Sequence, residues 1–177
     1  MKNILMPSDL SVQSLWPIKK IAESHNSSVP LTIHVIHLVE IPTSIADLLM
    51  LSRSKRTNRS LPHSYKDALQ ILQSKFNPEQ IKIKFEFVYG STHKALSNLM
   101  DVRRIEQVMV LDGYQYQFND KDSVDFIGFF KKIKVPVAYI PFKQATHSAF
   151  EGLSILLNDG KTDTNANELA FEPALAM

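Results

Sequence analysis

The sequence predicts an α/β protein built on a doubly wound, five-stranded parallel sheet with helices on both faces. Two observations support this fold class. Short apolar runs alternate along the chain with stretches whose apolar residues recur at helical spacing, an order typical of parallel strands joined by right-handed helical crossovers. The first run also lacks polar alternation, as a strand buried on both faces does. The five predicted strands lie at residues 3–6, 31–39, 81–87, 108–111 and 135–141.

The first predicted strand ends in a turn that carries the first candidate site residues. Pro7 cannot donate a hydrogen bond to a sheet ladder, so the strand should end there. Ser8, Asp9 and Ser11 follow and can cap the next helix. Open α/β sheets bind ligands outside the carboxyl ends of their strands. Asp9 is therefore either a ligand contact or a helix cap, and capping is the commoner use of such a residue.

The first half of the chain predicts two helices besides the strands. Apolar residues recur at helical spacing from Val12 to Ala22, and Pro17 must lie in the first turn of this helix or kink it. A second helix is expected after Ser60. Between them, the basic run at 53–59 is interpreted as solvated surface and not as a contact for an acidic partner.

The third predicted strand, at 81–87, alternates strictly between apolar and charged residues. Such a strand is half-exposed and belongs at a sheet edge, with Lys82, Lys84 and Glu86 pointing outward.

The second half predicts two more helices and two strands. Gly90 ends the third strand, and Ser91 or Thr92 caps the helix that follows. A polar loop follows the fourth strand, and Asp122 or Ser123 should start a helix that runs to Ile133. The last strand contains two prolines, which place it near a sheet edge.

Composition excludes several classes of function. The chain has 177 residues, 44% hydrophobic and 21% charged, and a net charge of +2, which does not indicate a nucleic-acid partner. The absence of cysteine excludes thiol catalysis, cysteine-ligated metals and disulfides. No apolar run could span a bilayer and no signal peptide is recognisable. We expect a cytoplasmic protein with no membrane partner.

No motif predicts a metal centre or a catalytic centre. His34 and His37 lie three apart in a strand and so point to opposite faces, which suits packing or a role at the sheet end and not a metal pair. No nucleophile–base pairing is visible, and a small hydrolase is therefore disfavoured.

Four short motifs resemble those of the universal stress protein family. The opening Asn3-Ile4-Leu5-Met6-Pro7-Ser8-Asp9-Leu10-Ser11 is similar to the first strand and Pro-x-Asp-x-Ser turn of that family. Ile36-His37-Leu38-Val39-Glu40 resembles the ending of its second strand. Val88-Tyr89-Gly90 resembles its glycine turn, and Val135-Pro136-Val137 resembles the start of its last strand. The match covers residues 1–142, which we take as one domain, and leaves 143–177 as a tail that could form a short helix or cover a sheet edge.

The resemblance implies an adenine nucleotide alpha hydrolase-like fold, a dimer through the last strand and, in many members, bound ATP. In such members Asp9 would face the adenosine, and the backbone near Leu38 and Val39 would flank the base. A Gly-x-x-Gly motif followed by Gly-Ser or Gly-Thr would hold the phosphates. The candidate cofactor-binding residues are therefore Pro7, Ser8, Asp9, Leu38, Val39, Gly113, Ser123 and Val124.

This chain departs from the family pattern at the phosphate site. Gly113 matches the first glycine, but Tyr116 stands at the second and Asp122-Ser123 replaces Gly-Ser. Tyr116 crowds the backbone, and the Asp122 carboxylate repels phosphate. We therefore expect no cofactor, with ATP or AMP held by altered contacts around Asp9 as the alternative. Six aromatic residues either fill the nucleotide volume or form core or dimer contacts: Tyr114, Tyr116, Phe118, Phe126, Phe129 and Phe130.

These observations predict a non-enzymatic regulatory protein of the universal stress protein type, acting in the stress response through protein contacts. We expect a homodimer formed from Val135 to Phe142, because a strand that is apolar on both faces should not end a sheet exposed to water. Cover by the tail is the alternative. The protein partner cannot be named from the sequence.

Overall fold

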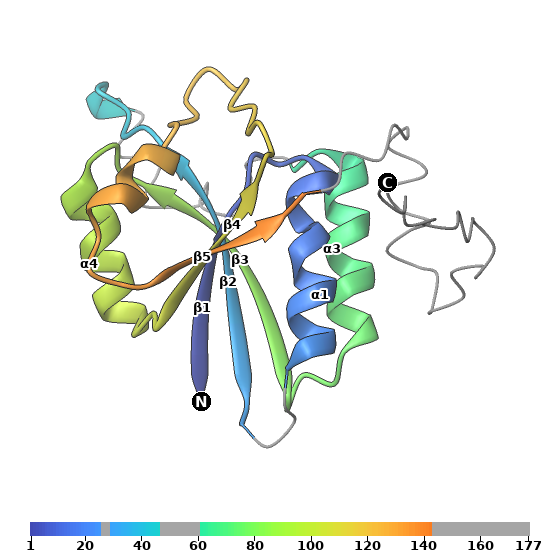
Figure 1. Cartoon of the computed structure of the whole chain (residues 1–177). Helices are drawn as coiled ribbons and strands as arrows, with labels where there is room; N and C mark the ends of the chain where they lie inside the picture. Colours follow the sequence, from blue (N-terminus) through green and yellow to red (C-terminus); the bar gives the residue numbers. More distant parts are fainter. Residues whose placement is uncertain (26–28, 47–60, 143–177) are drawn as a thin grey trace, which may run out of the picture.

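The computed structural model describes residues 1–25, 29–46 and 61–142. Its centre is a five-stranded sheet in which every pairing is parallel, in the order β3-β2-β1-β4-β5 (Figure 1). The predicted fold class is therefore confirmed. The strands are β1 (Lys2–Pro7), β2 (Leu31–Val39), β3 (Ile81–Tyr89), β4 (Gln107–Asp112) and β5 (Val137–Pro141).

The chain reverses its winding direction between β1 and β4. β1 pairs with β2 from Lys2 to Pro7, but its pairing with β4 covers only Ile4 and Leu5. Helices after β1 and β2 lie on one face of the sheet, and those after β3 and β4 lie on the other (Figure 1). In open α/β sheets this switch point is where ligand crevices form, beyond the carboxyl ends of the strands.

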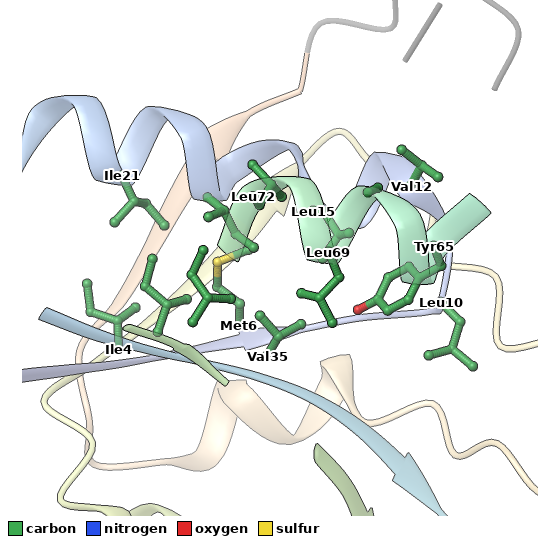
Figure 2. Close-up of a cluster of buried hydrophobic side chains, with 14 of the residues drawn as sticks. Ile4, Met6, Leu10, Val12, Leu15, Ile21, Val35, Tyr65, Leu69 and Leu72 are labelled. Carbon is green, nitrogen blue, oxygen red and sulfur yellow. The ribbon is translucent and has the colours of Figure 1, made fainter. Parts of the chain in front are cut away.

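One face is covered by α1 (Trp16–Ser24), which follows the short 3-10 helix η1 (Val12–Leu15), and by α3 (His63–Lys75). Pro17 lies in the first turn of α1, where its missing N–H costs nothing. Aliphatic side chains of the helices, such as Ile21 and Leu72, form one buried cluster with Ile4 and Val35 of the strands (Figure 2). Burial of these side chains is the main stabilising contribution of this face.

The other face is covered by α4 (His93–Arg103) and the 3-10 helix η2 (Ile127–Lys132). Thr92 caps α4 as predicted, its side chain accepting from the amide of Ala95 at 3.2 Å. Gly90 has φ +147°, and a Cβ there would lie 2.9 Å from that of Ala95, so the turn requires glycine. Phe126 and Phe130 join the core beneath.

The predicted helix from Asp122 or Ser123 to Ile133 is wrong in its first part. Residues 122–124 instead lie antiparallel to the end of β2, with a bridge between Val39 and Ser123. The amide of Glu40 donates to Asp122 O at 2.8 Å, and that of Val124 donates to Leu38 O at 3.0 Å. Because these backbone groups are bound to β2, helical structure begins only at Ile127.

Both predicted edge strands lie at the edges of the sheet. Lys82 and Lys84 of β3 are exposed, but Glu86 is half-buried because it binds Arg103 of α4 at 2.7 Å. Tyr139 on β5 is 60% exposed. In the described ranges, no helix has the length and apolar character needed to cross a bilayer. The whole of the predicted basic run at 53–59 and the whole tail fall outside the described residues.

Candidate functional site at the carboxyl end of the sheet

Ser8 connects the end of β1 to the helices of the α1/α3 face. Its side chain is fully buried, and its Oγ lies 2.8 Å from the Tyr65 hydroxyl and 2.9 Å from Ser14 Oγ. The amide of Leu10, which has a left-handed φ of 65°, donates to the same oxygen at 3.1 Å. Burial raises the pKa of Tyr65. The Ser8 hydroxyl therefore forms its hydrogen bonds to groups of its own chain.

Asp9 binds a segment that is distant in sequence. We call residues 113–125 the aromatic strap; it runs from the end of β4 toward η2 (Figure 1). Asp9 Oδ2 accepts from the Tyr114 hydroxyl at 2.7 Å and from the Gln117 amide at 2.9 Å. Its Oδ1 accepts from the amide and hydroxyl of Ser11, at 3.0 and 2.6 Å. Both carboxylate oxygens are thus bound within the chain.

The interpretation of Asp9 as a helix cap is wrong. Ser11 is the N-cap of η1, its side chain accepting from the Ser14 amide at 3.2 Å. Asp9 instead closes a tight turn onto Ser11 and holds the strap with its other oxygen. A cap and a strap anchor look the same in sequence, because the partners of Asp9 lie more than 100 residues away.

Aromatic side chains of the strap cover the carboxyl end of the sheet. Tyr114, Tyr116 and Phe118 are half-buried, while the residues between them are exposed. Their rings form a continuous series, with centroids 4.8 Å apart for Tyr114–Tyr116 and 6.1 Å for Tyr116–Phe118, which continues at 5.9 Å to His37 of β2. The Tyr116 hydroxyl also accepts from the Leu111 amide at 3.1 Å. The strap therefore spans from β4 to β2.

Burial of the strap tyrosines favours their neutral forms. Desolvation raises the pKa of Tyr116 to about 12, and it raises that of Tyr114 further. The Asp9 carboxylate adds to both shifts, because a negative charge nearby disfavours a phenolate. Tyr114 is consequently held as a hydrogen-bond donor to Asp9.

His37 and Ser123 form a pair that the sequence did not reveal. His37 is 1% exposed, and its Nδ1 lies 2.7 Å from Ser8 O while its Nε2 lies 2.8 Å from Ser123 Oγ. A carbonyl can only accept, so Nδ1 carries the proton, and in the neutral ring Nε2 accepts from the serine. No such pairing was visible in the sequence, and the structure brings this serine and histidine within hydrogen-bond distance. The two residues are 86 positions apart and belong to no common motif.

The other predicted site residues contribute to the fold through their backbone. Leu38 O accepts from Val124, and Val39 O accepts from Gly90 at 2.9 Å, so the backbone groups expected to flank a base are paired within the chain. Gly113 has φ +74° and turns the chain out of β4. Pro7 is the last residue of β1, as expected.

His34 lies apart from this site. Alternation along β2 places it on the α4 face, where its Nδ1 is 3.6 Å from Glu86 Oε1. Burial lowers its pKa, partly opposed by the Glu86 carboxylate. Among the described residues no group of three or more histidine, aspartate and glutamate side chains could hold a metal ion.

A cavity of about 460 Å³ lies at the opposite end of the strands. None of the predicted site residues line it. Its lining includes Lys2, Ile4, Ile21, His25 and Leu31.

Comparisons with known proteins establish the fold. No family model and no curated protein matches the sequence. The hypothetical protein MJ0577, whose structure served as a test case for assigning biochemical function, is similar in structure, with 14% identity, a TM-score of 0.52 and coverage of 81% of this chain and 98% of that one.

Weaker matches include two universal stress proteins. The universal stress protein UspA from Lactobacillus plantarum has 17% identity and a TM-score of 0.49 over 78% of this chain and 97% of that one. A family protein from Arabidopsis thaliana with AMP bound has 13% identity and a TM-score of 0.44 over 81% and 94%. The match to MJ0577 supports the parallel α/β fold alone, and the resemblance to the universal stress protein family stays a prediction from the sequence motifs.

Proposed function

We propose that this protein is a cytoplasmic regulatory protein of the universal stress protein type that acts through protein contacts, is not an enzyme and does not bind ATP. One observation carries the proposal: both oxygens of the Asp9 carboxylate are bound by the chain itself, two of the four donors coming from the aromatic strap.

A nucleotide that used Asp9 would have to displace the strap. It would break the bonds from Tyr114 and Gln117, and hydrogen bonds to a charged group contribute about 1.5–3 kcal/mol each. Losing two of them would weaken binding by about 3 kcal/mol or more, which corresponds to at least about 100-fold in the dissociation constant. The strap also lacks the glycine motif that lets backbone amides approach phosphates.

Calorimetry and thermal shift with millimolar MgATP and AMP test this proposal. We expect no saturable signal, with the AMP-bound Arabidopsis thaliana protein as a positive control in the same assay. The Asp122→Gly variant should behave in the same way, because Asp9 remains bound to the strap and Tyr116 keeps the second glycine position filled. A micromolar dissociation constant, about −8 kcal/mol, would favour the alternative of an adenine-nucleotide switch in which the ligand releases Tyr114.

We propose further that two copies associate through the edge from Val135 to Phe142. Within the part of the chain that the structure describes, β5 pairs with β4 alone, and Tyr139 is 60% exposed on it. An exposed strand edge invites pairing with another chain, and a two-fold contact closes it. Light scattering on the full chain should give the mass of a dimer. A monomer that aggregates only when the chain is stopped after Phe142 would mean that the tail covers the edge.

A further inference from the structure

We infer that Ser123 is an activated nucleophile that accepts an acyl group from small activated esters, with His37 as its general base. This goes beyond the proposed function, because it gives a protein without a catalytic cycle a site for covalent modification. The inference rests on the bonds that join Ser123, His37 and the backbone at Ser8.

The three groups have the roles of nucleophile, base and orienting group. Ser8 O fixes the proton on His37 Nδ1, which leaves Nε2 to accept the proton of Ser123 Oγ across 2.8 Å. The imidazole is held in place, because the rings of Phe87 and Phe118 pack on it with centroids 5.8 and 5.9 Å away. Ser123 itself is half-buried.

The chain contains a second serine–histidine contact that serves as an internal comparison. Ser97 Oγ lies 3.5 Å from His93 Nδ1 one turn apart on α4, and His93 Nε2 lies 3.1 Å from Lys132 O. At 3.5 Å the serine–histidine contact is a weak hydrogen bond at best. Ser97 should therefore show ordinary serine reactivity.

The surroundings of Ser123 favour uncharged acyl donors. Asp120, Asp122 and Asp125 are exposed near it in sequence and would repel an anionic donor. The aromatic neighbours of His37 suit a small apolar group such as acetyl.

In the proposed step, Ser123 Oγ forms a bond to the ester carbonyl carbon while the bond from that carbon to the leaving oxygen breaks. The serine proton passes to His37 Nε2 and from there to water, and the leaving group departs as its anion. The amides of Ser123 and Val124 already donate to Asp120 O and Leu38 O, so neither can stabilise an oxyanion. The acyl group should remain on Ser123, because an activated ester reacts readily without oxyanion donors whereas the alkyl ester formed on the serine does not.

The test treats the full-length protein with p-nitrophenyl acetate and locates acetyl groups by peptide mass spectrometry. We expect one acetyl group per chain on Ser123, with nitrophenolate released in a single burst. Ser123→Ala should abolish this adduct, and His37→Gln should slow it about 100-fold or more, since a general base contributes at least that much. Ser97→Ala should leave the rate unchanged.

Circular dichroism establishes which variants are folded. If His37→Gln does not fold, the position of the acetyl group on the wild-type chain decides. Acetylation confined to lysines, or spread equally over Ser97 and Ser123, would overturn the inference, as would a folded His37→Gln protein that reacts at the wild-type rate.

Discussion

Two regions of the molecule are stabilised by different interactions. One is the face of the sheet under α1 and α3, and the other is the carboxyl end of the sheet under the aromatic strap. Under the helices, aliphatic side chains such as Leu15, Ile18 and Leu72 are fully buried and contribute through the area they remove from water. Under the strap, hydrogen bonds join Asp9 to donors from Ser11, Tyr114 and Gln117. The first region sets the stability of the fold, and the second fixes the aromatic strap over the carboxyl end of the sheet.

The largest effect is expected in the helix-covered face. Leu72→Ala removes a fully buried side chain and should lower the free energy of unfolding by about 3 kcal/mol. Urea denaturation measures this loss. Val102→Ala, at a position that is 76% exposed on α4, should change stability by less than about 0.5 kcal/mol. Similar losses in the two variants would mean that burial does not distinguish these positions.

A smaller loss is expected at the strap anchor. Asp9→Ala leaves the Tyr114 hydroxyl and the Gln117 amide without their acceptor. The loss should be about 2 kcal/mol, less than the sum of the two bonds, because Tyr114 is half-buried and Gln117 exposed, so water replaces part of the bonding. Asp112→Ala is the matched control, because Asp112 ends β4 at the same side of the sheet but is exposed. If both variants were as stable as the parent, the strap would not be held by Asp9.

Alkaline pH should remove the stability that the buried Tyr116 side chain of the strap contributes. Tyr116 has a pKa raised from 10 to about 12 by burial, so the unfolded chain loses this proton first. The stability it contributes is complete below about pH 10 and is lost as the pH rises toward 12. Tyr116→Phe should reduce the stability lost between about pH 9 and 11 by up to about 1 kcal/mol. An unchanged pH dependence in this variant would contradict the buried position of the ring.

The smallest effect on stability is expected at the β3 edge, which neither region covers. Replacing Lys82 and Lys84 with valine should leave the free energy of unfolding within about 0.5 kcal/mol, because both side chains are exposed. The double variant should nevertheless aggregate, since the lysines blunt an open strand edge. Turbidity under matched conditions measures this, and a variant as soluble as the parent would argue against that role of the lysines.

The sequence was informative where the signal is local. A run rich in aliphatic and β-branched residues located β2 at its observed bounds, and the alternation of β3 placed it at an edge, because both signals lie within a few residues. The strap was harder to predict. Asp122 and Ser123 look like a helix start, but the backbone groups at the end of β2, more than 80 residues earlier, compete for the same atoms.

The candidate site shows the same limit. The sequence shows that no Gly-x-x-Gly spacing follows Gly113, since a glycine pattern has fixed spacing. The bonds of Asp9 to Tyr114 and of His37 to Ser123 could not be found in this way, because each joins residues brought together only by the tertiary fold.

Hydrogen exchange at the Gln117 amide, followed by NMR, tests most directly whether Asp9 holds the strap over the carboxyl end of the sheet. The hydrogen bond to Asp9 Oδ2 at 2.9 Å should protect this amide in the wild-type protein, and millimolar AMP should leave the protection unchanged. Protection should be lost in Asp9→Ala. An unprotected Gln117 amide in the wild-type protein, or one released by micromolar AMP, would contradict the account.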